Sequence, residues 1–252
     1  MDLENKKKYG MQTFVIAEAG VNHNGDFDLA KQLIIMAKNA GADAIKFQTF
    51  KAEESTGIYA EKAEYQKDST GESSQLEMIR SLELPFSDFY ELKRLADDLK
   101  IEFISTPDGL ESLNCLVNLG VERIKIGSTE VTNIPFLEEI GRVKKPVILS
   151  TGMSSLGEVE KAVETLELAG CEDITLMHCT TSYPTAIEQV NLRAMVTMRD
   201  AFKLPVGYSD HTLTNEAAIA AVTLGATCIE KHITLDKMMD SAGKPWSCHS
   251  IL

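Results

Sequence analysis

The sequence predicts a (β/α)8 barrel, also called a TIM barrel. Eight short runs rich in β-branched and other apolar residues alternate with longer segments of helical periodicity. Nearly continuous apolar strands separated by helices are typical of a parallel sheet covered by helices, and eight such units close into a barrel. A doubly wound open sheet is the alternative, but the G-x-G-x-x-G fingerprint of dinucleotide-binding sheets is missing.

The expected strands follow one another along the whole chain. They are 14–20 (FVIAEAG), 44–49 (AIKFQT), 102–106 (EFIST), 123–128 (RIKIGS), 147–152 (VILSTG), 174–180 (ITLMHCT), 206–210 (VGYSD) and 228–234 (CIEKHIT). Each is short enough for a strand and ends in polar residues. The carboxyl ends of these strands are therefore the places where a site is expected.

Helices are expected between the strands. Residues 26–43 and 155–173 space their apolar residues by three and four and end near Gly, which suits a helix C-terminus. Residues 238–252 show no helical apolar periodicity, so an eighth helix is expected to be lacking. The connection 51–84 is longer than a βα unit requires, and it is predicted to be a lid or binding loop.

Composition excludes several classes of protein. The formal net charge is −13, which argues against a general nucleic-acid surface or an anionic-membrane surface. The chain shows no signal-peptide pattern and no apolar run of about 18 residues that could span a membrane. Five cysteines without a C-x-x-C pair indicate free thiols in a reducing compartment. The sequence therefore predicts a cytoplasmic protein.

Reactive side chains gather at the ends of the expected strands. In chain order they are Glu18, Asn22, His23, Asn24; Lys46, Gln48; Ser105, Thr106, Asp108; Lys125, Ser128, Glu130; Ser150, Thr151; His178, Thr180, Thr181, Tyr183; Ser209, Asp210, His211; and Glu230, Lys231, His232. Each alone has an ordinary explanation as a core hydrogen bond, an ion pair or a helix cap. Inward charges at many strand ends are costly unless they are paired or used, so the pattern as a whole indicates a site.

Two chemical features stand out in this set. His211 and His232 follow neighbouring strands, so their imidazoles can converge on one ion in an open, catalytic metal site. Lys46 and Lys125, with Ser and Thr hydroxyls, can hold a phosphate or a carboxylate. The residues thus indicate a metal-assisted reaction on a small phosphorylated or carboxylated substrate.

The motifs that carry these residues resemble the sialic acid synthase family, the phosphoenolpyruvate-dependent synthases of nine-carbon sugar acids. They are IAEAGVNHNGDFDLAKQLI, AIKFQTF, STPDG, KIGSTE, LSTGMSS, HCTTSYPT, GYSDHT and EKHITLDK, and they span roughly residues 12–237. The resemblance implies the same barrel fold. It also implies condensation of phosphoenolpyruvate with the open-chain aldehyde of an N-acylated mannosamine-type sugar.

The resemblance assigns roles by motif. His211 and His232 would bind a divalent metal, Mn²⁺ or else Mg²⁺ or Co²⁺, which polarises the aldehyde. Lys46, Thr106, Lys125, Ser128, Ser150 and Ser209 would hold phosphoenolpyruvate, with Lys46 and Lys125 counted as catalytic because they stabilise developing charge. Glu18 and Glu130 would transfer protons or position water. Gln48, Tyr183 and Glu230 would contact the sugar hydroxyls.

The sequence also departs from the family pattern. Thr129 stands where a Gly is usual. Thr181 stands where some members have an Asn that contacts phosphoenolpyruvate, so the resemblance assigns Thr181 to substrate binding with one contact changed. Residues 1–237 are expected to form the synthase domain, and 238–252 an atypical tail that is truncated or frame-shifted, without the family's antifreeze-like C-terminal domain. Full-length members are expected to be homodimers.

Several functional alternatives stay open at this point. The acceptor sugar is either N-acetylmannosamine or the diacetamido-trideoxy sugar that leads to legionaminic acid. Another metal-dependent or lysine-dependent aldolase-type barrel would use Lys46 or Lys125 as a Schiff-base lysine. A non-catalytic remnant of a synthase is the third alternative.

Overall fold

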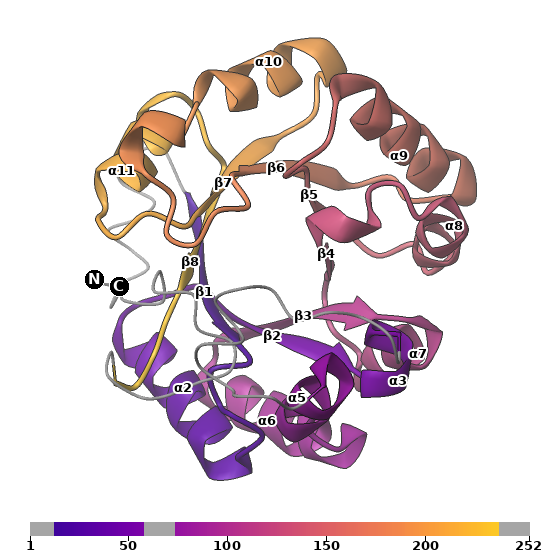
Figure 1. The fold of residues 1–252 in the computed structure, drawn as a ribbon, viewed down its shortest axis with the longest axis vertical. Coiled ribbons are helices and arrows are strands. Elements are labelled where there is room, and N and C mark those ends of the chain that lie inside the picture. Colours follow the sequence, from indigo (N-terminus) through magenta and orange to yellow (C-terminus); the bar gives the residue numbers. More distant parts are fainter. Residues whose placement is uncertain (1–12, 58–73, 237–252) are drawn as a thin grey trace.

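The structure is a computed structural model that describes residues 13–57 and 74–236. Eight parallel strands form one sheet in the order β3-β2-β1-β8-β7-β6-β5-β4. They are β1 (Phe14–Gly20), β2 (Ala44–Phe50), β3 (Glu102–Asp108), β4 (Ile124–Ile126), β5 (Val147–Ser150), β6 (Ile174–Cys179), β7 (Val206–Asp210) and β8 (Cys228–His232). The end strands β3 and β4 also contact each other, so the sheet closes into the ring seen in Figure 1. The predicted (β/α)8 barrel is confirmed.

Four of the expected strands end earlier than the sequence indicates. β6 stops at Cys179 and β8 at His232, one and two residues before the expected ends. β4 stops at Ile126, because Ser128–Glu130 turn into the short 3-10 helix η1. β5 stops at Ser150, ahead of the turn that contains Gly152. These four predictions were too long, since apolar composition alone does not show where a strand turns out of the sheet.

Apolar residues form two buried groups, one inside the barrel and one between the strands and the surrounding helices. A separate buried cluster lies inside the barrel, two residues nearer the amino ends of the strands than the polar residues of the inner wall. It consists of Ile16, Ala44, Ile104, Ile148, Met177 and Cys228. The alternate residues of the same strands join the larger core that the helices cover, with Phe47 and Phe103 stacked at a centroid distance of 5.5 Å. Alternation along each strand thus separates the barrel interior from the helix interface.

Helices cover the outside of the barrel in the described part of the chain. They are α2 (Phe27–Asn39), α6 (Phe86–Leu99), α7 (Leu110–Leu119), α8 (Ile134–Arg142), α9 (Leu156–Ala169), α10 (Arg193–Phe202) and α11 (Glu216–Thr223), with η2 (Ile187–Gln189) before α10. Side-chain caps start α2 and α9, where Asp26 accepts from two backbone N–H groups and Ser155 forms a capping box with Glu158. Gly170 ends α9 at φ 112°, a conformation that favours glycine.

The chain after β8 falls largely outside the described residues. An eighth helix would lie beyond residue 236, where 237–252 are not described. The expected lack of that helix, and the expected atypical tail at 238–252, therefore stay predictions. Over the described residues, no helix is long and apolar enough to cross a membrane.

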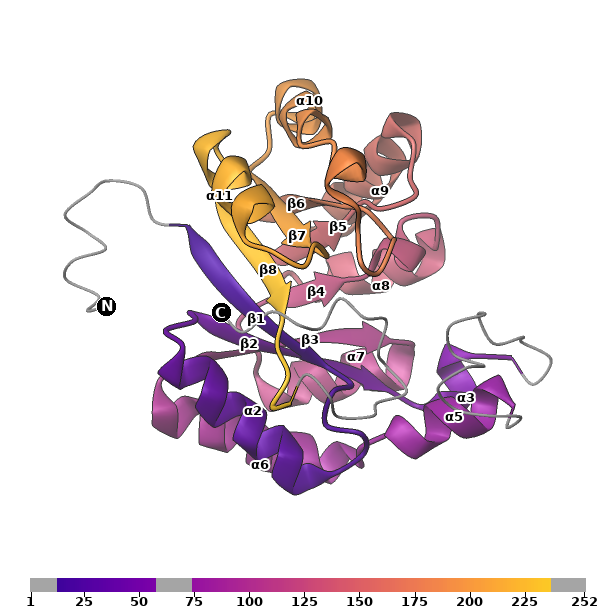
Figure 2. The same ribbon diagram turned by 60° about the vertical axis from the view of Figure 1, so that its left-hand side comes forward.

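The long connection after β2 carries two further helices, α3 (Ala52–Ser55) and α5 (Gln75–Leu82). Figure 2 shows them next to each other beyond the carboxyl ends of β2 and β3, and they are in contact. Glu83 joins the two ends of the connection, because its carboxylate accepts from Lys51 Nζ at 2.5 Å and from Ala52 N at 2.9 Å. Residues 58–73 of the predicted lid lie outside the described part.

Candidate functional site

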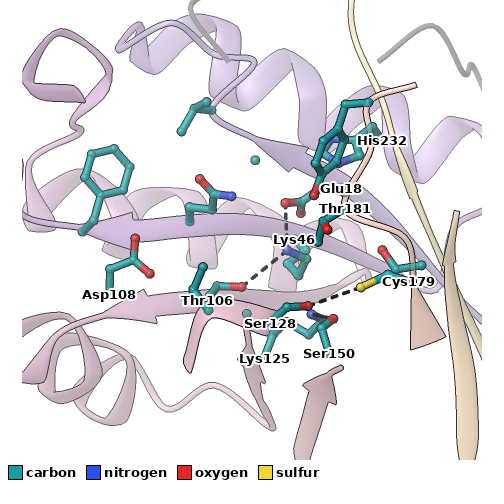
Figure 3. Close-up of a pocket in the computed structure, with 18 of the residues that line it drawn as sticks. Glu18, Lys46, Thr106, Asp108, Lys125, Ser128, Ser150, Cys179, Thr181 and His232 are labelled. Atoms are coloured by element: carbon teal, nitrogen blue, oxygen red, sulfur yellow. Dashed lines mark hydrogen bonds and ion pairs between the residues drawn. The ribbon is translucent and has the colours of Figure 1, made fainter. Parts of the chain in front are cut away.

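A cavity of about 470 Å³ opens at the carboxyl ends of the strands. Every site residue predicted from the sequence except Glu130 lines it: Glu18, Lys46, Gln48, Thr106, Lys125, Ser128, Ser150, Thr181, Tyr183, Ser209, His211, Glu230 and His232. Figure 3 shows several of them converging from different strands. The structure thus brings together residues that lie far apart in the sequence.

The strand register explains this convergence. Glu18 is paired with Lys46 on one side and with His232 on the other, and Ser209 is paired with Glu230. Paired residues of adjacent parallel strands point to the same face of the sheet. These side chains therefore form one layer on the inner wall, directly above the apolar cluster.

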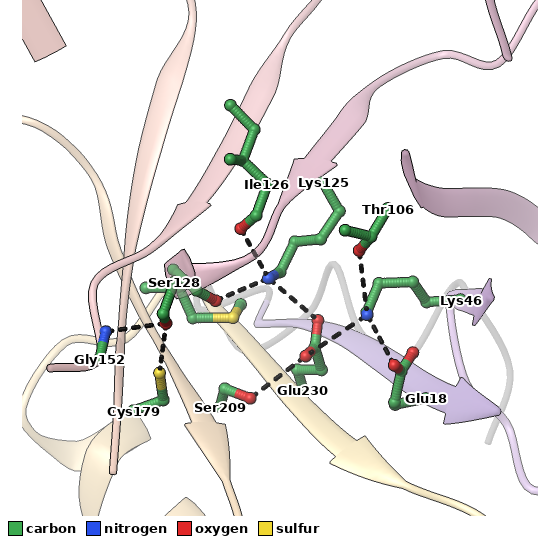
Figure 4. Close-up of polar contacts among 12 residues, drawn as sticks. Glu18, Lys46, Thr106, Lys125, Ile126, Ser128, Gly152, Cys179, Ser209 and Glu230 are labelled. Carbon is green, nitrogen blue, oxygen red and sulfur yellow. Dashed lines mark hydrogen bonds and ion pairs between the residues drawn. The ribbon is translucent and has the colours of Figure 1, made fainter. Parts of the chain in front are cut away.

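Four charged groups alternate across the floor of the cavity (Figure 4). Lys46 Nζ lies 2.7 Å from Glu18 Oε1 and 3.8 Å from Glu230 Oε1, and Lys125 Nζ lies 3.9 Å from Glu230 Oε2. All four side chains are nearly inaccessible to solvent. The array therefore places two ammonium groups, each beside a carboxylate, in a buried site where they can donate to an anion.

Hydroxyl groups surround these charges. Lys125 donates to Ser150 Oγ at 2.6 Å, Lys46 donates to Thr106 Oγ1 at 3.4 Å, and Ser209 donates to Glu230 Oε1 at 3.2 Å. Hydroxyls can donate as well as accept. These three hydroxyl groups can therefore offer further hydrogen-bond donors to a phosphate or carboxylate.

Burial and the neighbouring charges set the protonation of the floor. Burial raises the pKa of Glu18 to about 7 and outweighs the opposing effect of Lys46. Burial alone would raise the pKa of Glu230 as well, but Lys125 and Lys46 together lower it to about 2. Burial lowers the pKa of Lys125. Glu18 is thus the carboxyl group of the floor that can exchange a proton near neutral pH.

The two histidines face each other with their ring centroids 5.6 Å apart. His211 Nδ1 lies 2.7 Å from the carbonyl oxygen of Thr180, and since a carbonyl only accepts, Nδ1 carries the hydrogen and Nε2 keeps its lone pair. Burial lowers the pKa of His211, and burial together with His211 lowers the pKa of His232 to about 3. Both imidazoles are therefore neutral at physiological pH and able to ligate a metal.

The donor set fits an open metal site. In residues 13–57 and 74–236, no group of three or more His, Cys, Asp or Glu side chains is arranged to hold a metal ion. His211 and His232 would supply two imidazole nitrogens and leave the other coordination positions to water and substrate. Tyr183, whose ring centroid is 4.2 Å from that of His211, borders the same space.

The backbone at Gly152 lies close to Ser128 and Cys179 on one side of the cavity, a contact that was not predicted from the sequence. Gly152 N donates to Ser128 Oγ at 2.9 Å, and Ser128 Oγ lies 3.3 Å from Cys179 Sγ. A Cβ atom at position 152 would lie 2.8 Å from Thr181 Cγ2 and 2.9 Å from Cys179 Sγ. Only glycine leaves room there. Cys179 is a cavity residue that the strand-end motifs did not single out, and Gly152 positions the Ser128 hydroxyl that lines the cavity.

Some strand-end residues point away from the cavity. Lys231 Nζ pairs with Asp210 Oδ2 at 2.6 Å and donates to the carbonyl oxygens of Thr212 and Thr214. His178 Nε2 lies 2.8 Å from the carbonyl oxygen of Val190, to which it donates. These groups alternate with the inward layer, and they stabilise the connections outside the barrel.

Glu130 also lies apart from the cavity lining. It ends η1, and its Oε2 accepts from Asn133 Nδ2 at 2.6 Å. Together with Glu54 and Asp108 it borders a neighbouring hollow. The expected role of Glu130 in proton transfer or water positioning receives no support from its position and stays a prediction.

Comparison with known proteins identifies relatives over most of the chain. Residues 33–250 match the NeuB family. N,N'-diacetyllegionaminic acid synthase of Legionella pneumophila is 50% identical over 234 residues, which are 91% of this chain and 66% of that protein. The enzyme of the same name from Campylobacter jejuni is 51% identical over 231 residues, 90% of this chain and 69% of that protein.

A solved structure supports the same relationship. The crystal structure of N-acetylneuraminic acid synthetase from Leptospira borgpetersenii in complex with citrate superposes with a TM-score of 0.82 at 34% sequence identity. The alignment covers 95% of this chain and 78% of that one. This chain spans about two thirds of the length of the two curated relatives.

Proposed function

Because this chain belongs to the NeuB family, we propose that it condenses phosphoenolpyruvate with the aldehyde form of an N-acylated amino sugar. The products are a nine-carbon sugar acid and phosphate. The observation that carries this proposal is the pair of buried ammonium groups, Lys46 and Lys125, on the floor of a cavity that also holds two neutral imidazoles. An anion site beside a metal-competent site matches the two substrates.

The reaction has two parts, which are bond formation at C3 of phosphoenolpyruvate and loss of phosphate from C2. C3 of phosphoenolpyruvate forms the new bond to the aldehyde carbon, and the aldehyde oxygen takes up a proton. Water adds to C2 and releases a proton, which balances the proton that the aldehyde oxygen takes up. The bond between C2 and the phosphate oxygen breaks, and phosphate leaves. Lys46 and Lys125 hold the phosphate and carboxylate, with Thr106, Ser128 and Ser150 as further donors, and they stabilise the charge that develops.

Glu18 is the proton donor that the geometry favours. Its pKa of about 7 allows it to carry a proton at neutral pH, and within the described residues its Oε2 is buried without a hydrogen-bond partner. An unpaired buried oxygen is costly unless a ligand satisfies it. We assign to Glu18 the transfer of a proton to the aldehyde oxygen.

A divalent ion belongs to this proposal, with Mn²⁺ as the first choice and Mg²⁺ or Co²⁺ as alternatives. His211 Nε2 and His232 would hold it, and when bound it polarises the aldehyde carbonyl. The neutral state of both rings, and the Nδ1–H of His211 fixed by Thr180, support this assignment. The expected cytoplasmic location and homodimer stay predictions.

We further propose the diacetamido-trideoxy sugar as the acceptor. The two N,N'-diacetyllegionaminic acid synthases are 50% and 51% identical to this chain, against 34% for the N-acetylneuraminic acid synthetase. The test measures release of phosphate from phosphoenolpyruvate with the diacetamido-trideoxy sugar and with N-acetylmannosamine, each with and without Mn²⁺. Faster release with the diacetamido sugar supports the proposal. No release with either sugar would refute the proposed condensation.

One observation favours a second candidate. Burial lowers the pKa of Lys125, which is a property of lysines that form Schiff bases. Borohydride reduction in the presence of an aldehyde or ketone substrate distinguishes the two mechanisms. A synthase of the proposed kind traps nothing, whereas a Schiff-base aldolase becomes covalently labelled.

A further inference from the structure

The cavity extends beyond its charged floor to α5. Four residues of this helix line it, Gln75, Met78, Ile79 and Leu82, together with Phe50 at the end of β2. Their spacing of three, four and seven residues places all four on one face of the helix. Met78, Leu82 and Phe50 are nearly inaccessible to solvent. We call these five residues the α5 arm.

Gln75 is the polar member of the α5 arm, and its amide oxygen is unused. Within the described residues, Gln75 Oε1 is buried and has no hydrogen-bond partner. The helix does not need this side chain, because Ser74 and Glu77 form the capping box at its start. A buried acceptor without a donor indicates that a ligand supplies the donor.

The α5 arm lies at the right distance from the floor for the far part of the sugar. Lys46 and Phe50 are four residues apart on β2, and at ~3.3 Å per residue this is roughly 13 Å along the strand. Eight carbon–carbon bonds of about 1.5 Å, in a zigzag chain, give a nine-carbon product roughly 10 Å long. Asp108, which is paired with Phe50 across β2 and β3, also lines the cavity and is labelled in Figure 3.

We propose that the α5 arm binds the acylamido group on the sugar carbon farther from the aldehyde, and that it thereby selects diacylated over monoacylated sugars. The inference rests on the proposed function. Gln75 Oε1 accepts from the N–H of that group, while Met78, Ile79 and Leu82 pack against its acyl methyl. A hydroxyl at the same carbon supplies no methyl to fill the apolar part of the arm.

The test compares two acceptor sugars that differ only in this group. Phosphate release is measured with the diacetamido sugar and with the same sugar carrying hydrogen in place of the whole distal acylamido group, using the parent chain and Gln75→Met. Loss of one hydrogen bond lowers kcat/KM for the diacetamido sugar by about 2- to 12-fold. The rate with the other sugar is expected to change by less than about twofold.

A second variant tests the apolar part. Ile79 is only partly buried, so Ile79→Ala is expected to fold. If the acyl methyl packs on Ile79, this variant gains relative activity on a distal propionyl group over acetyl, an effect that general destabilisation does not produce. Gln32 is exposed on α2, so Gln32→Met is the matched control. It should change neither the ratio of rates with and without the distal acylamido group nor the ratio of rates with propionyl and acetyl groups.

The outcomes separate this inference from the proposed function. If the parent releases phosphate but Gln75→Met slows both sugars equally or neither, the α5 arm is not an acyl subsite, while the synthase assignment stands. An unchanged propionyl-to-acetyl ratio in Ile79→Ala contradicts the inference in the same way. If the parent is inactive with every sugar although it binds phosphoenolpyruvate in calorimetry, the proposed function fails, and the subsite fails with it.

Discussion

Replacing Lys231 by Met tests whether this buried lysine belongs to the scaffold. Its ammonium group pairs with Asp210 at 2.6 Å and donates to the carbonyl oxygens of Thr212 and Thr214. The side chains of Lys231 and Asp210 are 2% and 0% exposed. Met keeps most of the volume but leaves the carboxylate of Asp210 buried without its counter-charge.

The magnitude follows from that burial. Removing one partner of a buried ion pair costs about 3–5 kcal/mol, because the other charge stays desolvated. For a chain of this size about 1 kcal/mol shifts the melting temperature by ~2–4 °C, so Lys231→Met should melt roughly 6–20 °C below the parent. The double variant Lys231→Met/Asp210→Leu should recover a large part of this loss, since no unpaired charge remains.

Thermal unfolding followed by circular dichroism is the assay. Lys161→Met is the control, because Lys161 forms an exposed pair with Glu164 at 3.8 Å and such pairs contribute little. Since Thr212 follows His211, Lys231→Met should also weaken divalent-ion binding. A melting temperature within about 2 °C of the parent would refute the scaffold role that we give to this pair.

Three further predictions concern the site. His211→Ala and His232→Ala should each abolish divalent-ion binding in calorimetry without unfolding the chain. Because burial lowers the pKa of both rings, ion binding by the parent should persist to lower pH than for imidazoles with the ordinary pKa of 6.5. Undiminished binding in His211→Ala would contradict the metal assignment. Lys46→Met and Lys125→Met should each weaken phosphoenolpyruvate binding by about 1.5–3 kcal/mol, the range for hydrogen bonds to charged groups; parent-like affinity in both would place the anion site elsewhere. Glu18 has a folded-state pKa of about 7 against an ordinary 4.5, so its contribution to the free energy of unfolding is complete below pH 4.5 and is lost as the pH rises through 7. Glu18→Gln should therefore flatten the dependence of the free energy of unfolding on pH between 4.5 and 7, measured by urea titration. An unchanged slope would show that Glu18 is not the titrating group.

The fold and much of the site were accessible from the sequence because barrel chemistry follows a simple rule. Strands were visible as apolar runs, and their carboxyl ends were known to meet on one face. What the sequence reading left unused was the alternation along each strand. Ser209 and His211 point inward and Asp210 points outward, so parity alone would have separated site residues from scaffold residues.

Other parts of the site depend on contacts that no local pattern contains. The face of α5 that carries Gln75 and Met78 could be placed only once the helix was seen against the end of β2. The requirement for glycine at position 152 arises from the approach of β6 to the turn after β5. Glu130 was expected in the cavity because it follows a strand, but η1 carries it to a neighbouring hollow.

The alternating charges on the floor have a consequence for substrate uptake. Glu18 and Glu230, when both are ionised, neutralise Lys46 and Lys125, so the empty floor offers no net positive charge. A ligand that brings both a phosphate and a carboxylate upsets this balance and favours the protonated form of Glu18. Binding is then accompanied by proton uptake from solution. The affinity for phosphoenolpyruvate should therefore fall in alkaline solution, and the heat of binding should depend on the ionisation enthalpy of the buffer.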